Sequence, residues 1–81
     1  MVAIRVNNIG SVLQDQEDRA GALAKYQEAE RIDRAAFGDD HPNVAICVNN
    51  IGRVLHDQGD RAGALARFEE AERIDRGAYG D

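Results

Sequence analysis

Few residues in this sequence could act as nucleophiles or as metal ligands. Its only cysteine is Cys47, its only serine is Ser11, and it contains neither threonine nor tryptophan. A metal site needs three or four converging ligands, but His41 lies in a linker and His56 is more than two helical turns from Cys47. Ser11 has no histidine at a spacing that would activate it as a nucleophile. We therefore predict no metal site, no cofactor site and no catalytic centre, and we do not expect an enzyme.

Adjacent asparagines occur twice, as Asn7 with Asn8 and as Asn49 with Asn50. A primary amide both donates and accepts hydrogen bonds, so an asparagine at each step of a repeating surface can bracket the backbone of an extended peptide without recognising its side chains. The alternative is that these amides only bond to neighbouring helices, and the sequence leaves both possibilities open. Arg53, three residues after the second pair, would add a charge-assisted contact to an acidic peptide.

The composition allows one small domain and argues against two classes of partner. The chain has 81 residues, with 15 acidic and 10 basic side chains and a formal charge of -5, whereas binding to a phosphate backbone depends on clustered Lys and Arg. The longest uncharged stretch, residues 43–52, is far shorter than the roughly 20 apolar residues of a membrane span, and Arg5 interrupts any signal-like N-terminus. We expect a soluble, cytoplasmic protein that binds neither nucleic acid nor membranes.

An internal repeat defines the organisation of the chain. Residues 2–39 align with residues 44–81 without gaps, and 29 of the 38 aligned positions are identical. The copies are offset by 42 residues, which leaves residues 40–43 as the joint between them. Repeat periods of about 20 to 50 residues are typical of solenoids, in which each unit needs a neighbour to cover its apolar face. We predict a single domain, residues 1–81, built from two such units.

Each copy has the apolar spacing of two amphipathic helices. In the second copy, the first apolar stripe consists of Val44, Val48, Ile51 and Leu55, and the next consists of Ala64, Leu65, Phe68, Ala71 and Ile74. The first helix is predicted to begin near Pro42, with Asp40 as its N-cap, and to end around residues 58–60. The second is predicted to end around residues 77–80. The same pattern in the first copy gives four helices, no strand and an all-α fold.

Charged and small residues support these helices. Glu69 with Arg73, and Glu72 with Arg76, are spaced i,i+4 with the acid first, an arrangement that stabilises a solvent-exposed helix face. Small residues stand where the two helices of a copy must approach closely: Gly10 and Ala22 in the first copy, Gly52 and Ala64 in the second. We therefore predict direct contact between paired helices at these positions.

The whole pattern resembles the tetratricopeptide repeat, and more closely its 42-residue form found in kinesin light chains and in many scaffold proteins. The residues that carry the resemblance are Val48, Ile51, Gly52, Leu55, Gly59, Ala64, Phe68 and Ala71, their counterparts Val6, Ile9, Gly10, Leu13, Ala22, Tyr26 and Ala29, and the joint GDDHPNVA. Glu17 departs from the pattern by replacing the turn glycine represented by Gly59, so we expect a less tight first turn. Arg19 and Arg61 stand where the family often has an aromatic residue. A pair of HEAT or armadillo repeats has a similar period and is the alternative.

The resemblance implies a protein-interaction or scaffold module made of two stacked helix-turn-helix repeats, in which the first helix of each repeat lines a concave groove. Family members that bind peptides use an asparagine on this helix, at the position of Asn8 and Asn50. Helical spacing then gives the groove stripe as Ile4, Asn8, Ser11 and Asp15, followed by Ile46, Asn50, Arg53 and Asp57. We predict contacts to a peptide or protein partner at Asn8, Ser11, Asp15, Asn50, Arg53 and Asp57. Two repeats make a short groove, so we expect weak binding by one chain.

Two nearly identical units are also expected to self-associate. The outer face of the last helix resembles the face on which the second repeat packs, so the two ends of the pair are complementary. Chains would join by head-to-tail stacking or by exchanging a helical hairpin across residues 38–43. A structural self-assembly unit without a separate ligand is therefore the alternative function. The same ends also fit an excerpt of a longer array, and the near identity of the copies fits recent duplication or consensus design.

The single cysteine permits no internal disulfide. Cys47 occupies the position that Arg5 fills in the other copy, which shows that this position tolerates a charged side chain. We therefore expect the thiol to be exposed or at an interface, where oxidation would allow an intermolecular disulfide.

Overall fold

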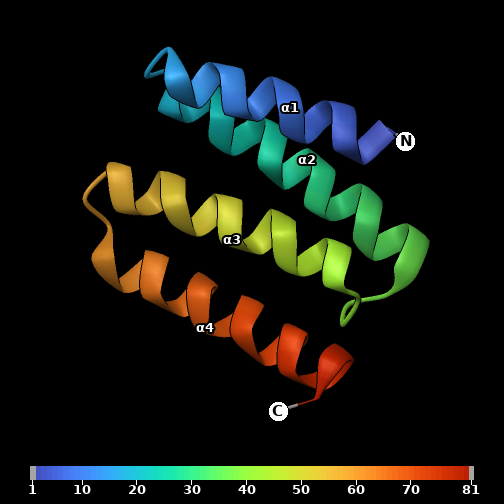
Figure 1. Cartoon of the computed structure of the whole chain (residues 1–81). Helices are drawn as coiled ribbons and strands as arrows, with labels where there is room; N and C mark the ends of the chain where they lie inside the picture. Colours follow the sequence, from blue (N-terminus) through green and yellow to red (C-terminus); the bar gives the residue numbers. More distant parts are fainter. Residues whose placement is uncertain (1, 81) are drawn as a thin grey trace.

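The computed structural model describes residues 2–80, which form four helices in a row (Figure 1). They are α1 (Val2–Asp15), α2 (Arg19–Phe37), α3 (Pro42–Asp57) and α4 (Arg61–Tyr79). Each helix packs mainly against its neighbours in the chain, and the helices form a slab of 35 × 29 × 15 Å. Residues 2–80 contain no strand, so the predicted all-α fold of two helix-turn-helix repeats is confirmed. Residues 1 and 81, the outer bounds of the predicted domain, lie outside the described residues.

The second helix of each repeat has the same N-terminal cap. Asp18 accepts a hydrogen bond from the backbone N–H of Gly21 at 3.0 Å, and Asp60 accepts one from Gly63 at 2.9 Å. These bonds satisfy donors that the first turn of a helix otherwise leaves without a partner. The two repeats therefore start α2 and α4 in the same way.

The N-cap of α3 differs from the prediction. Asp40 is wrong as the cap because α3 begins at Pro42, which places His41 in the capping position. Nδ1 of His41 accepts a hydrogen bond from the backbone N–H of Asn43 at 3.0 Å, as an aspartate oxygen would. The imidazole also stacks on Phe37 at the end of α2, with ring centroids 4.3 Å apart. His41 thus contacts both helices that the linker joins, α2 through Phe37 and α3 through Asn43.

The turns between paired helices share one geometry although their residues differ. Gly59 has a φ of 84° and Glu17 a φ of 64°, both in the left-handed region. In each turn the following residue donates its N–H to the carbonyl five positions earlier, at 2.8 Å for Asp18 and 2.9 Å for Asp60. The expectation of a less tight first turn is therefore wrong. Glu17 adopts the conformation of a glycine, at a cost of about 1 kcal/mol or more.

Small residues allow the paired helices to approach closely, as predicted. A methyl group at Gly10 would lie 2.7 Å from Cε1 of Tyr26, and one at Gly52 would lie 2.7 Å from Cε1 of Phe68. Each aromatic ring therefore packs directly against the backbone of the facing helix. The second predicted contact position, an alanine in each repeat, is also buried.

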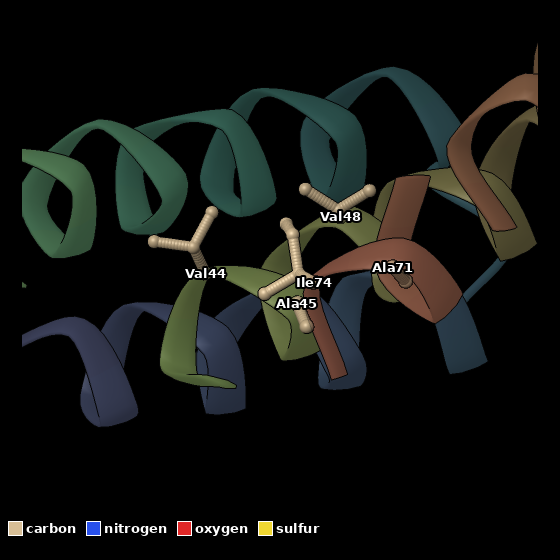
Figure 2. Close-up of a cluster of buried hydrophobic side chains, with 5 residues drawn as sticks. All are labelled: Val44, Ala45, Val48, Ala71 and Ile74. Atoms are coloured by element: carbon tan, nitrogen blue, oxygen red, sulfur yellow. The ribbon is translucent and has the colours of Figure 1, made fainter. Parts of the chain in front are cut away.

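The core continues from one repeat into the other. One cluster contains Val44, Ala45, Val48, Ala71 and Ile74 (Figure 2). In Figure 2 the side chains of Val44 and Val48 point towards the neighbouring green and teal ribbon of α2. A further cluster joins Ala22 and Tyr26 of the first repeat to Ile51 and Val54 of α3. α3, which packs on α2 and on α4, has the most buried residues of the four.

Cys47 is fully buried where α3 packs on the first repeat. The expectation of an exposed thiol is therefore wrong, and the interface that contains it lies within the chain. Its Sγ donates a hydrogen bond to Oδ2 of Asp33 at 3.4 Å, and burial raises the pKa of the thiol to about 11. The aligned Arg5 is exposed because α1 has a neighbour on one side only. An intermolecular disulfide through Cys47 would require the repeats to separate.

Ion pairs connect the second helices of the two repeats, α2 and α4. Glu30, Arg34, Arg67 and Glu70 form a closed ring of four pairs between α2 and α4, with N–O distances of 2.7, 3.1, 3.1 and 3.3 Å. We call this ring the inter-repeat charge network; its side chains are 13% to 31% exposed, so solvent screens them only in part. Of the two i,i+4 pairs predicted on α4, Glu72 with Arg76 forms at 3.4 Å. Arg73 instead lies 3.9 Å from Asp40.

Candidate functional site

The first helices of the two repeats, α1 and α3, line a cavity of about 340 Å³. This volume falls within the range of about 300 to 1,000 Å³ that ligand pockets occupy. The lining residues are Ile4, Asn7, Asn8, Ser11, Tyr26, Asp33, Asn43, Ile46, Asn50 and Arg53. Because all but two of them belong to α1 or α3, we call this cavity the α1–α3 groove.

Four of the six residues predicted to contact a partner line the groove: Asn8, Ser11, Asn50 and Arg53. Asp15 and Asp57 do not line it, because each lies one helical turn further along its helix, at the last helical residue. Oδ2 of Asp57 accepts a hydrogen bond from Nε2 of Gln14 at 3.0 Å and so links the ends of α3 and α1. Arg53 lies between the groove and a neighbouring cavity lined by Asp57 and Gln14.

Two isoleucines give the groove an apolar part. Ile4 and Ile46 occupy aligned positions, and each is 55% exposed although both are large apolar side chains. Each lies one turn before an asparagine of the predicted stripe, Asn8 or Asn50. The groove therefore presents an apolar and an amide side chain from each repeat.

The structure separates the roles of the asparagines. Nδ2 of Asn7 donates to Sγ of Cys47, and Oδ1 of Asn7 accepts from Nδ2 of Asn50, both at 3.5 Å. Asn7 is thus occupied in joining α1 to α3, as the structural alternative supposes. Asn8 is exposed, and among the described residues its side chain has no hydrogen-bond partner. Asn50 keeps its carbonyl oxygen available, so Asn8 and part of Asn50 face the open groove.

Among the lining residues that were not predicted from the sequence are Tyr26 and Asp33, and both come from α2. Asp33 is 4% exposed and accepts the hydrogen bond of the buried thiol. The Tyr26 hydroxyl donates to Oε1 of Gln14 at 3.0 Å, and burial raises the pKa of this phenol. The signal that could have found them is the buried stripe of α2, in which Ala22, Tyr26, Ala29 and Asp33 follow one another at spacings of four, three and four.

The accessible charge of the groove is positive, although the chain as a whole is acidic. Of the ten lining residues, Arg53 is the one cation and Asp33 the one acid. Arg53 is exposed, whereas Asp33 is buried and bonded to Cys47. A ligand that enters the groove therefore meets the guanidinium before it meets the carboxylate.

The two histidines lie apart in the fold. His41 caps α3, and His56 lines the cavity beside Asp57. In residues 2–80, no three side chains of His, Cys, Asp or Glu gather closely enough to hold a metal ion. No helix in this range combines the length and apolar character needed to cross a membrane.

Sequence comparison agrees with the helical architecture. A family model described as tetratricopeptide repeat matches residues 2–77, nearly the whole chain, which decides against the HEAT or armadillo alternative. The match does not distinguish the 42-residue form typical of kinesin light chains, so that subtype stays a prediction. A search of curated proteins finds no match. The two stacked helix-turn-helix units and this match show that the chain belongs to the tetratricopeptide repeat family, which suggests a protein-interaction module.

Proposed function

We propose that the chain is a non-catalytic interaction module that binds an extended polypeptide segment in the α1–α3 groove. The observation that carries this proposal is that aligned side chains of both repeats, Ile4 with Ile46 and Asn8 with Asn50, line one cavity. A surface on which the same side chains recur from helix to helix suits a ligand whose hydrogen-bonding groups also recur at regular intervals. An extended polypeptide does so, because it presents one N–H and one C=O per residue at intervals of about 3.3 Å.

The two exposed amides would bind the backbone of such a segment. Asn8 has its whole amide available, and Asn50 has its carbonyl oxygen. Side-chain amides that pair with backbone groups hold a peptide in place without discriminating between sequences. Selectivity would then come from the other groove residues, above all Ile46 and Arg53.

Helix geometry gives the expected spacing of the ligand's side chains. Ile46 and Arg53 are seven residues apart on α3, which corresponds to about 10 Å along the helix axis. About three residues of an extended chain span this distance. We infer a segment with an apolar residue against Ile46 and, about three positions away, an Asp or Glu whose carboxylate pairs with Arg53.

The test is selection from a library of random peptides with the purified 81-residue chain as bait. Affinities of the selected peptides are measured by fluorescence anisotropy for the wild type and for Asn8→Ala and Arg53→Ala. We expect each substitution to weaken binding about five- to tenfold, the size of one lost hydrogen bond or exposed charge-assisted contact. Gln27→Ala, at an exposed position of α2 outside the groove, is the matched control and should not change affinity. Selection of no peptide, or of peptides that bind both groove variants as well as the wild type, would contradict the proposal.

A second candidate function is self-assembly, which the exposure of α1 favours. Val2, Ile9 and Val12 are 64%, 49% and 55% exposed, whereas the aligned Val44, Ile51 and Val54 are 0%, 1% and 0% exposed. These side chains of α1 lack the cover that the first repeat gives to α3. Light scattering during size exclusion, over a hundredfold range of concentration and with reductant present, measures the mass. Growth to multiples of 8.9 kDa supports self-assembly, and a monomer throughout contradicts it.

A further inference from the structure

The outer side of the second repeat reproduces the surface on which α3 packs. A shallow cavity of about 410 Å³ on this side has Asn49, Phe68, Ala71 and Asp75 among its lining residues. Their counterparts in the first repeat are Asn7, Tyr26, Ala29 and Asp33, and each of these bonds to α3 or shares a core cluster with it. We call the outer surface the receiving face. It has the residues that hold α3 in the first repeat, but it holds no helix within the described residues.

The exposed side of α1 matches the side of α3 that packs on the first repeat. Val2, Arg5, Ile9 and Val12, which we call the docking stripe, are all exposed. Their aligned residues on α3 are Val44, Cys47, Ile51 and Val54, and all of these are buried. The docking stripe therefore has the apolar side chains needed to pack on the receiving face, and it differs from α3 at one position.

The charges at the two edges are also complementary. Lys25 and Glu28 pair at 3.4 Å on the first repeat, in the positions that Arg67 and Glu70 occupy in the inter-repeat charge network. On the second repeat Glu72 and Arg76 pair at 3.4 Å, in the positions of Glu30 and Arg34. If a second copy stacks in the register of the internal repeats, Lys25 and Glu28 of one chain meet Glu72 and Arg76 of the other. Each edge thus carries one half of the network that already joins α2 to α4.

The one difference between docking stripe and α3 adds a charge pair. Inside the chain, the thiol of Cys47 lies 3.4 Å from a carboxylate oxygen of Asp33. In a second copy stacked in this register, Arg5 would face Asp75, and both side chains are exposed in the single chain. A guanidinium beside a carboxylate forms a stronger, charge-assisted contact than a thiol does. Arg5 has the reach and the charge that the contact between chains can use.

We propose that a second copy of this chain docks head to tail, with the docking stripe of one chain on the receiving face of the next and Arg5 paired with Asp75. The proposal rests on the self-assembly candidate and not on peptide binding. Hairpin exchange does not compete with it for these surfaces, because exchange re-forms the internal interface and leaves the docking stripe exposed. Stacking also has a consequence for binding: the cavity lined by Ile46, Asn50 and Asp75 becomes a further groove between α3 and the incoming α1.

Charge reversal tests the register of this contact. The concentration at which half the chains are associated is measured by light scattering and sedimentation velocity. We expect Arg5→Asp and Asp75→Arg to raise it at least tenfold each, because like charges then face one another. The double variant Arg5→Asp/Asp75→Arg restores opposite charges and should return within about threefold of the wild type. Arg19→Asp makes the same charge change at an exposed position of α2 outside the docking stripe and serves as the control.

Every other result would contradict one identifiable part of the proposal. All substituted side chains are exposed, so the variants are expected to fold, and circular dichroism is the measurement that checks this. Single variants that associate like the wild type overturn the Arg5–Asp75 contact. A closed dimer that does not grow with concentration and ignores Arg5→Asp indicates hairpin exchange and overturns stacking. A monomeric wild type overturns self-assembly, while peptide anisotropy on the same samples reports separately on the groove.

Discussion

Replacing Glu17 with glycine should stabilise the chain. Glu17 is exposed and has a φ of 64°, in the region that the aligned Gly59 occupies with a φ of 84°. The left-handed conformation costs an L-residue about 1 to 2 kcal/mol. A glycine avoids this cost, but its unfolded chain has more freedom to lose on folding, which offsets about 0.5 to 1 kcal/mol. We therefore expect the free energy of unfolding to rise by about 0.5 to 1 kcal/mol.

Thermal unfolding followed by circular dichroism measures this change. For a domain of this size, 1 kcal/mol corresponds to about 4 to 8 °C in Tm, so Glu17→Gly should raise Tm by about 2 to 8 °C. Association would make Tm depend on concentration. The comparison is therefore made at low micromolar concentration and repeated in the Arg5→Asp background.

The repeat supplies the controls for this experiment. Gly59→Glu makes the reciprocal change in the second turn and should lower Tm by a similar amount. Gln16→Gly introduces a glycine next to Glu17 but at a residue whose φ is not positive, so it should lower Tm as well. A Glu17→Gly variant whose Tm falls, as that of Gln16→Gly does, would refute the assignment of strain to this turn.

Four further predictions concern the core and the linker. Gly52→Ala should lower the free energy of unfolding, measured in urea, by about 1 to 3 kcal/mol, because the new methyl group would lie 2.7 Å from the ring of Phe68. The control is Gly77→Ala, which should not destabilise the chain because nothing lies within 4 Å of the added methyl group. His41→Ala should cost about 1 kcal/mol in the same assay because it removes the cap of α3, and His41→Asn should recover most of this loss. Cys47 should react with a thiol reagent about a hundredfold or more slowly in the folded chain than in urea at the same pH. The reason is that a pKa raised from 9.0 to about 11 reduces the fraction of thiolate by that factor. Equal rates would show that the thiol is accessible in the folded chain. Because this pKa is higher in the folded state, its contribution to stability is complete below about pH 9 and is lost as the pH rises towards 11, and Cys47→Ala should remove this part of the pH profile.

The fold could be predicted from the sequence because both repeats have the same pattern of apolar residues. Two aligned apolar stripes with a helical period, joined by short turns, leave few alternatives to paired antiparallel helices. The close contacts at Gly10 and Gly52 follow from the absence of a side chain opposite an aromatic ring. Part of the groove stripe could be placed for the same reason: helical spacing puts Asn8 and Ser11 on one face, and the structure brings both into the cavity, although Asp15 and Asp57 lie outside it.

The wrong expectation for Cys47 arises because aligned positions have different neighbours. Alignment treats Arg5 and Cys47 as equivalent, but α1 has one helical neighbour and α3 has two, so one side chain is exposed and the other buried. The burial of Asp33 follows from the same packing, because α3 covers it while the aligned Asp75 is exposed. The cap of α3 was missed for a local reason: the ring nitrogen of His41 acts as the acceptor that an aspartate side chain usually supplies.

The few sequence differences between the two repeats make the two halves of a nearly repetitive chain chemically distinct. Ser11 and Arg53 are aligned, yet only the second repeat carries a charge at this position, so a segment with one acidic residue would have a preferred orientation along the α1–α3 groove. Arg5 and Cys47 are aligned, yet only the outer position carries a charge, so the contact proposed between chains differs chemically from the contact inside the chain. Identical repeats would allow internal and external interfaces to exchange freely. The substitution at Arg5 instead favours an external contact with Asp75 that the buried thiol of Cys47 cannot make.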